Sequence, residues 1–277
     1  ALIGPATVGA ALRLRNGAAL DQALSVAETE GRFYFMGMPL DPLDLDQTVE
    51  RARTAMVERR PLRQSDVNVA KLIGAMDDPV LWSDVAGCGL INIDGMGVLL
   101  GMRLAGMRPP GRVAGVDLMD RLLAVCAAEG FRPYILGAES TVLERAVKRL
   151  SARHPGLVFA GWRDGYFSPE EEPGVVDAIR RSGADALFVA MPTPAKERLL
   201  ARWGDALGVS FAMGVGGAVD VAAGLRRRAP LWVQRAGLEW FFRMVQEPRR
   251  LGPRYLTTNL RFALLLFGEI LHRRPRP

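Results

Sequence analysis

The stretch Asp94-Gly95-Met96-Gly97 places one carboxylate directly after the apolar run Leu90–Ile93 and directly before a second apolar run. A carboxylate in this position can act as a general base if partial burial raises its pKa towards the working range. Gly95 and Gly97 allow a ligand or another backbone segment to approach closely. Asp94 is equally suited to cap a helix that follows it, so its position leaves both roles open.

A second glycine-rich stretch, "GVGGAVD", contains Gly214, Gly216 and Gly217 and lies between a predicted strand and a predicted helix. Backbone amides exposed there can hold a diphosphate at the start of the helix. The stretch is not a P-loop, because no Lys-Ser/Thr pair follows, and it is not the dinucleotide fingerprint G-x-G-x-x-G. Tight packing between the strand and the helix would explain these glycines as well.

These residues lie in a chain of alternating apolar strands and amphipathic helices. Strands are predicted at 32–38, 89–94, 132–138, 156–162, 184–191 and 209–217. Helices are predicted at 44–60, 97–106, 116–130, at 140–150 with Ser140 as its cap, at 168–183 beginning with Ser168, and at 194–204.

Strands that are apolar on both faces and alternate with helices predict an α/β fold, with a parallel sheet covered by helices on both sides. Ligands of such sheets bind at the carboxyl ends of the strands. The residues expected at those ends are Asp94, Gly137, Met191 and Gly214.

Composition limits the classes of protein to which the chain can belong. Of its 277 residues, 49% are hydrophobic and 24% are charged, which fits a folded globular protein. Two cysteines, Cys88 and Cys126, predict no disulfide framework and favour a reducing compartment. Two histidines are too few for a His-rich metal site, and no apolar run reaches the ~18 residues that a membrane span needs.

The positive charge is concentrated at the C-terminal end. Residues 225–277 contain twelve arginines and three glutamates, a net charge of +9, whereas the whole chain carries +6 and residues 1–224 therefore −3. Such an end indicates an anionic partner: phosphate, nucleic acid or anionic lipid. We therefore expect a leader of uncertain structure at 1–31, the α/β core at 32–224 and an Arg-rich helical appendage at 225–277.

Several motifs follow one another in a specific order, among them "INIDGMGVLL", "ADALFVAMPTPAKERLLARW" and "RAPLWVQRAGLEWFFRMVQEPRR". Over roughly residues 33–270 they resemble the WecG/TagA/CpsF family of bacterial glycosyltransferases, glycosyltransferase family 26. The resemblance implies a Rossmann-like domain with a C-terminal membrane-binding appendage. It also implies inverting transfer of a sugar from a UDP-sugar to a polyprenyl-diphosphate-linked saccharide, without a metal ion or cofactor, in surface or exopolysaccharide synthesis.

The resemblance also implies roles for individual residues. Asp94 matches the aspartate of the family's D-G-[MI]-G motif, its proposed general base. Asn68 matches the asparagine of a T-x-N motif that faces the active site, but Asp66 stands where threonine is expected. In the family's P-K-Q-E motif, Lys196 replaces the glutamine and Glu197 is kept.

The changes at Asp66 and Lys196 turn a neutral pair into one acidic and one basic residue, so we expect the two side chains to form an ion pair. They point to a donor other than the family's usual N-acetylmannosamine, unless neither position touches the substrate. Glu197 is expected either to bind a sugar or ribose hydroxyl or to pair with Arg198 or Arg202.

The arginine-rich end is expected to bind anions. Gly214, Gly216 and Gly217 form what we call the glycine turn. Arg226, Arg227 and Arg228 follow it closely in the sequence and can reach the diphosphate of donor or acceptor. Helices that mix aromatic residues, leucines and arginines suit the interface of an anionic membrane. The resemblance accordingly implies a cytoplasmic protein, peripheral on the inner face of the bacterial inner membrane, and is compatible with a homo-oligomer.

Other functions stay open on the sequence. A basic, aromatic stretch can also bind single-stranded nucleic acid, but no RNA-binding signature accompanies it, so no nucleic acid partner is expected. A Rossmann dehydrogenase is disfavoured because the dinucleotide fingerprint is missing. A non-catalytic family member that binds a UDP-sugar without transferring it is compatible with the departures at Asp66 and Lys196.

Overall fold

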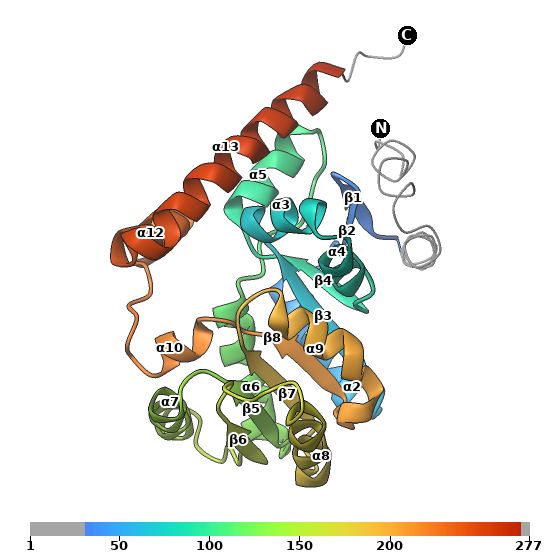
Figure 1. Ribbon diagram of the computed structural model, residues 1–277, viewed down its shortest axis with the longest axis vertical. Helices are drawn as coiled ribbons and strands as arrows, with labels where there is room; N and C mark the ends of the chain where they lie inside the picture. The colour runs from blue at the N-terminus through green and yellow to red at the C-terminus, as the bar shows by residue number, and fades with distance from the viewer. Residues whose placement is uncertain (1–30, 273–277) are drawn as a thin grey trace.

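The computed structural model describes residues 31–272; the predicted leader lies outside the described residues except for Gly31, as do residues 273–277. The centre of the molecule is a six-stranded, parallel sheet in the order β4-β3-β8-β7-β5-β6 (Figure 1). The predicted α/β class with a parallel sheet is confirmed. The strands are β3 (Leu62–Val67), β4 (Leu90–Ile93), β5 (Pro133–Gly137), β6 (Gly161–Arg163), β7 (Ala186–Ala190) and β8 (Phe211–Gly214).

Helices cover both faces of the sheet, because side chains alternate between the faces along each strand. Ile135 of β5 belongs to one buried cluster and Leu136 to another. The first cluster lies under α2 (Leu45–Val57), α6 (Gly115–Glu129), α7 (Ser140–Arg153) and α10 (Ala218–Ala222). The second lies under α8 (Glu172–Ser182), α9 (Ala195–Trp203) and the 3-10 helix η1 (Gly204–Leu207).

A third buried cluster lies beside β4, towards the end of the molecule where the C-terminal helix runs (Figure 1). A hairpin of β1 (Phe33–Phe35) and β2 (Met38–Leu40) forms part of it. Three helices complete it: α3 (Val69–Asp77), α4 (Pro79–Ala86) and α5 (Met96–Leu104). The prediction of one strand at 32–38 is therefore wrong, because Met36 and Gly37 turn the chain with positive φ angles of 51° and 82°.

Three other local predictions are wrong. The strand predicted at 156–162 is in fact β6, which begins only at Gly161. Ser140 is the first residue of α7 rather than its cap, and its hydroxyl donates a hydrogen bond to Asp164 instead. Helix α8 begins at Glu172 and not at Ser168. Strand β3 was not predicted, because its sequence "LRQSDV" is polar. Its Gln64 is buried all the same, where its side-chain amide donates a hydrogen bond to Asn92.

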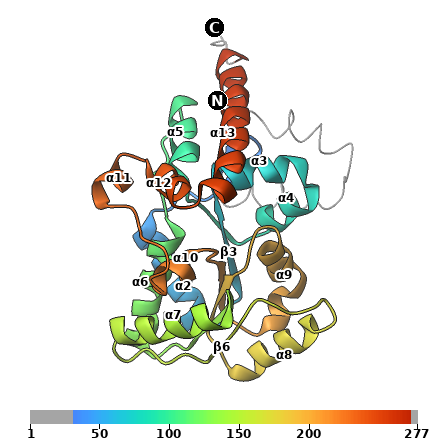
Figure 2. The same ribbon diagram turned by 60° about the vertical axis from the view of Figure 1, so that its left-hand side comes forward.

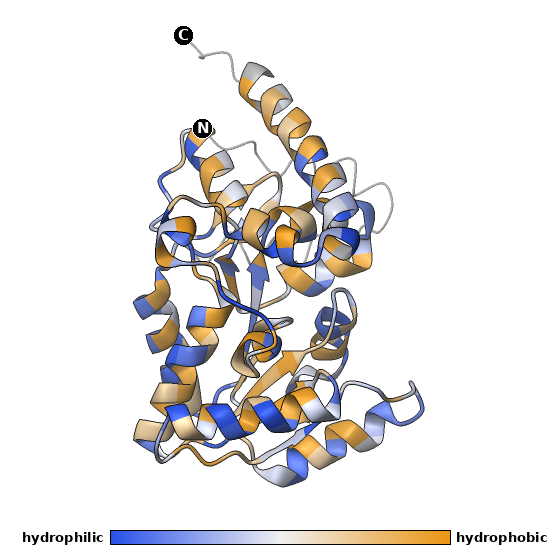
Figure 3. Cartoon of the chain, turned by 90° about the vertical axis from the view of Figure 1, so that its left-hand side faces the viewer, coloured by the Kyte–Doolittle hydropathy of each residue, from blue (hydrophilic) through white to orange (hydrophobic). Residues whose placement is uncertain are grey.

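Three helices follow in the described part of the C-terminal segment: α11 (Leu231–Arg235), α12 (Glu239–Gln246) and α13 (Pro248–His272). Helix α13 packs on α3 (Figure 1). Its Phe262 and Leu266 are buried in the third cluster. Hydrophobic and polar residues alternate along α13, the helix that ends near the C-terminus (Figure 3). No helix within residues 31–272 is long and apolar enough to cross a membrane.

Candidate active site

The loop after β4 is seated on the carboxyl end of the neighbouring strand β3. The backbone N–H of Asp94 donates a hydrogen bond of 3.0 Å to the carbonyl of Val67. A Cβ on Gly95 would lie 3.0 Å from the Cβ of Asn68, and one on Gly97 would lie 2.6 Å from Cγ2 of Val69. Both glycines are therefore required by close packing of the Asp94 loop against the β3–α3 junction.

Asp94 itself is not used as a helix cap. The N-cap of α5 is Gly95, and no side-chain hydrogen bond caps that helix. The Asp94 side chain is only partly exposed, and burial raises its pKa to about 6, with the negative charge of Asp66 adding to the shift. Arg112 and Arg243 act in the opposite direction and limit the rise. A carboxyl group with this pKa is largely ionised at neutral pH yet basic enough to accept a proton.

The two arginines near Asp94 come from distant parts of the chain. Arg112, from the loop before α6, forms a 2.9 Å ion pair with Glu239 at the start of α12. Arg243, on the same helix, extends over the glycine turn, where a Cβ on Gly217 would lie 3.2 Å from its Nη2. Among residues 31–272, no carboxylate forms an ion pair with Arg243. Helix α12 of the arginine-rich segment thus contributes directly to the surroundings of Asp94.

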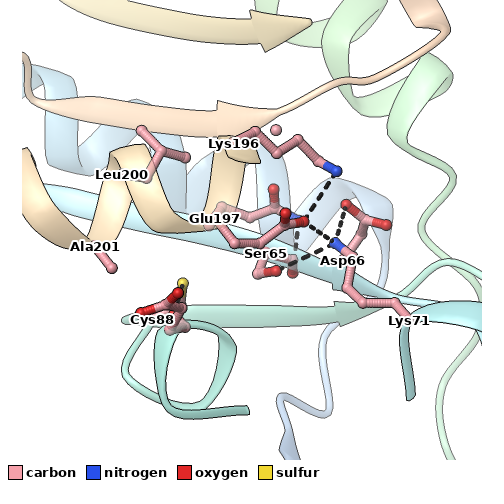
Figure 4. A pocket seen from close by; sticks show the side chains of 11 residues that line it. Ser65, Asp66, Lys71, Cys88, Lys196, Glu197, Leu200 and Ala201 are labelled. Carbon is pink, nitrogen blue, oxygen red and sulfur yellow. Dashed lines mark hydrogen bonds and ion pairs between the residues drawn. The ribbon is translucent and has the colours of Figure 1, made fainter. Parts of the chain in front are cut away.

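Asp66 belongs to a buried network of four charged side chains (Figure 4). Lys71 lies at its centre, with its Nζ 3.1 Å from Asp66 Oδ1 and 2.9 Å from Glu197 Oε1. Lys196 Nζ is also 2.9 Å from Glu197 Oε1, and it contacts the hydroxyl of Thr193. The network joins the end of β3 to the start of α9, which follows β7.

The network differs from the pairing expected from the sequence. Asp66 pairs with Lys71 rather than directly with Lys196, so Lys71 and Glu197 connect the two. The expected partners of Glu197 are also wrong: Arg198 pairs with Asp78 and Arg202 with Glu172. One oxygen of Glu197, Oε2, is buried without a hydrogen-bond partner.

Charges within the network stabilise one another against burial. Burial would raise the pKa of Glu197, but Lys71 and Lys196 lower it to about 2. Burial would lower the pKa of Lys71, but Asp66 and Glu197 raise it above its ordinary value. Burial and the neighbouring charge of Lys71 lower the pKa of Lys196. The contact with Lys71 fixes the position of the Asp66 side chain close to Asp94.

Asn68 connects the network to the Asp94 loop. Its Oδ1 accepts a hydrogen bond from the backbone N–H of Lys71 and caps α3, while its Cβ lies against Gly95. The cap orients α3 so that Lys71, in the first turn, points back towards Asp66. Contact of Asn68 with the substrate stays a prediction.

The other predicted strand-end glycines have structural reasons of their own. Gly137 ends β5 with a φ of 119°, and a Cβ there would lie 2.5 Å from the carbonyl of Ala190. Gly214 leaves room for Lys196, whose Cδ and Cε would lie 2.7 Å from an added Cβ. Met191, after β7, packs on the second cluster of the sheet. All three lie at the expected edge; their contact with a ligand stays a prediction.

Arg226, Arg227 and Arg228 line a cavity of about 30 Å³ together with Gly217 of the glycine-rich stretch after β8. Arg226 pairs with Glu247 at 3.3 Å, and Arg228 forms ion pairs with Asp117. The backbone N–H of Arg227 donates to Gln246. The residues that line this cavity and that we consider for anion binding are Gly217, Arg226, Arg227, Arg228 and Arg243.

Substitution of Asp66 by asparagine is expected to lower the pKa of Asp94, because it removes the negative charge that helps to raise it. If Asp94 must be ionised for activity, the rise in rate with increasing pH will then occur at lower pH in Asp66→Asn than in the wild type. The measurement is the pH dependence of kcat/KM for both proteins. An unchanged or higher midpoint would show that Asp66 does not act on the titrating group.

Sequence reasoning missed Lys71, Arg112 and Arg243. Lys71 carried a weak signal, since it falls three residues after Asn68 in the first turn of a helix that the cap predicts. Arg112 and Arg243 carried no such signal. They lie 18 and 149 residues after Asp94 in the sequence, and only the fold brings them near it.

Two comparisons relate the chain to known proteins. Residues 33–276 match the model of the "Glycosyl transferase WecG/TagA/CpsF family". The N-acetylglucosaminyldiphosphoundecaprenol N-acetyl-beta-D-mannosaminyltransferase of Bacillus subtilis (strain 168) is 31% identical over 202 residues, which cover 71% of this chain and 78% of that protein. The matched range 33–276 includes every site residue named above.

Proposed function

The chain belongs to the WecG/TagA/CpsF family of glycosyltransferases, and from that premise we propose that it transfers a sugar from a UDP-sugar to a polyprenyl-diphosphate-linked saccharide. The observation that carries the proposal is Asp94: a partly buried carboxylate with a pKa of about 6 at a strand end, close to two arginines. The Bacillus subtilis relative is named for an undecaprenyl-diphosphate-linked acceptor, which supports this class of acceptor here.

The arrangement is suited to a single displacement with inversion. Asp94 would take the proton from the acceptor hydroxyl while its oxygen forms a bond to the anomeric carbon. The bond from that carbon to the diphosphate breaks at the same time, and UDP leaves with the electron pair. Positive charge on the diphosphate side would stabilise the departing anion.

Arg243 is the residue that we propose to bind the donor diphosphate. Its guanidinium lies over Gly217, has no carboxylate partner within residues 31–272, and is close enough to lower the pKa of Asp94. Guanidinium groups bind phosphate oxygens with two parallel hydrogen bonds. A diphosphate at the glycine turn would place the anomeric carbon between Arg243 and Asp94.

Arg243→Gln is expected to raise KM for the donor about 10- to 100-fold, since a hydrogen bond to a charged group contributes about 1.5–3 kcal/mol. It should also raise the pKa of Asp94, because a nearby positive charge is lost. The control is Arg235→Gln, which changes an exposed arginine of α11. Equal donor KM values for the two variants would exclude Arg243 from the donor site.

Helix α13 is proposed to hold the protein on the membrane that contains the lipid-linked acceptor. Its inward residues Phe262 and Leu266 are buried in the protein. On other sides it exposes large apolar residues together with Arg249 and Arg254, a mixture typical of helices that lie in a membrane interface. The exposed apolar residues are Leu256, Leu260, Leu264, Leu265, Phe267 and Ile270. We propose that this position is peripheral, on the inner face of the membrane.

The charged network distinguishes the candidate donors. Asp66 and Lys196 stand where the family's motifs have threonine and glutamine, and both belong to the charged network, so we propose a donor other than UDP-N-acetylmannosamine. Purified protein should be incubated with a panel of UDP-hexoses and a short-chain prenyl-diphosphate sugar, with UDP release as the readout. We expect one donor to be consumed only when the acceptor is present. UDP binding without consumption of any donor would favour the non-catalytic alternative.

A further inference from the structure

The C-terminal half of α5 exposes an apolar and basic surface. Leu100 and Leu104, with 49% and 66% of their surface exposed, lie one helical turn apart, and Arg103 is on the same side of the helix. Arg103 and Arg108, which follows the helix, are exposed, and neither forms an ion pair with another residue of the described range. We call these four residues the α5 face.

The α5 face lies at the same end of the molecule as α13. The two helices are in contact, because a Cβ on Gly101 would lie 2.8 Å from Cζ of Phe262. They project side by side beyond the sheet, as Figures 1 and 2 show. The exposed leucines of α13 at positions 256, 260 and 264 recur every four residues and form a stripe along one side of that helix.

We propose that the α5 face binds the surface of a bilayer that contains anionic lipids, so that the catalytic core and the C-terminal helices form one membrane-binding end. The inference rests on the proposed function, since a lipid-linked acceptor requires the site to lie near a bilayer. Leucines enter the interface while the neighbouring arginines meet anionic headgroups, and the α5 face contains both. No carboxylate lies among its four residues to oppose that attraction.

The position of α5 connects the proposed bilayer contact to Asp94. The helix begins two residues after Asp94, and its nine residues span about 13 Å at 1.5 Å per residue. A bilayer contact at its far end would therefore hold Asp94 on the order of 13 Å from the interface. The α5 face would set the depth at which an acceptor sugar meets the base.

The test is flotation of the full chain with vesicles of phosphatidylglycerol and phosphatidylethanolamine, and with vesicles of phosphatidylcholine alone. Leu100→Ser/Leu104→Ser is expected to weaken binding to both kinds of vesicle about tenfold or more, because apolar surface is lost. Arg103→Gln/Arg108→Gln is expected to weaken binding about tenfold to the anionic vesicles only. The matched control is Val57→Ser/Val158→Ser, which changes two residues of similar exposure, 55% and 59%, that lie outside α5 and α13.

Transfer assays separate this inference from the proposed function. The α5 variants should retain transfer to a short-chain, water-soluble acceptor and lose most transfer to a long-chain acceptor in vesicles. If no variant and no wild-type protein transfers a sugar, the proposed function fails, while the flotation result still decides the membrane contact. Unchanged flotation of both α5 variants would overturn the inference. If flotation is unchanged and the α5 variants sediment as a smaller species than the wild type, the α5 face binds a second copy of the chain instead.

Discussion

Asp94→Asn is expected to lower the rate of sugar transfer about 10²–10⁴-fold, the usual effect of removing a positioned general base. The amide cannot accept the proton of the acceptor hydroxyl, but it has nearly the same shape as the carboxyl group. The Asp94 side chain does not cap α5, so the fold should be unaffected. Affinity for UDP should also change little, because the proposed diphosphate contacts come from Arg243 and the glycine turn.

The measurement is kcat for transfer, together with the UDP dissociation constant and the thermal unfolding midpoint of the same variant. Asp205→Asn, at an exposed position in η1, is the matched control and should behave as the wild type. A rate above half that of the wild type would exclude Asp94 as the base. A loss of rate accompanied by a large fall in the unfolding midpoint would instead indicate a structural role.

Lys71→Met is expected to lower the free energy of unfolding by about 3–5 kcal/mol, because removing one partner of a buried ion pair leaves its counter-charges uncompensated. Lys71 is buried and contacts both Asp66 and Glu197, and one oxygen of Glu197 already has no hydrogen-bond partner. Methionine has a similar length, so loss of packing should contribute little.

Urea-induced unfolding of the variant and the wild type measures this difference. Lys148→Met, at an exposed position on α7, should change stability by no more than about 0.5 kcal/mol. A second substitution, Asp66→Asn in the Lys71→Met background, should restore part of the lost free energy of unfolding, since it removes one of the two carboxylates that Lys71 neutralises. If Lys71→Met costs less than about 1 kcal/mol, the network is not held together by Lys71.

The parallel sheet could be predicted because most of its strands are apolar on both faces, and an apolar run that alternates with helices has few other solutions. Strand β3 escaped prediction because two of its three buried residues, Gln64 and Ser65, are polar. Gln64 donates a hydrogen bond to Asn92, and Asn92 donates one to Thr48. Hydropathy cannot reveal such a strand, because its partners come from another strand and a helix.

The site was predictable to the extent that it depends on strand ends. Asp94 and Gly214 were expected at the edge where the structure places them. The partners of the charged residues were not predictable, because charges far apart in the sequence meet only in the folded chain. Asp66 was expected to contact Lys196, but α3 brings Lys71 between Asp66 and Glu197. The role of α12 was hidden for the same reason, since Arg243 is 149 residues from Asp94.

The central claim is that Asp94 accepts the acceptor proton, and the pH dependence of transfer by the wild type and by Asp94→Asn tests it most directly. For the wild type we expect kcat/KM to rise tenfold per pH unit at acidic pH and to level off near pH 6, the pKa that burial and Asp66 give to Asp94. The residual rate of Asp94→Asn should show no such rise. The same rise with the same midpoint in Asp94→Asn would contradict the account, because the titrating base would then be another group.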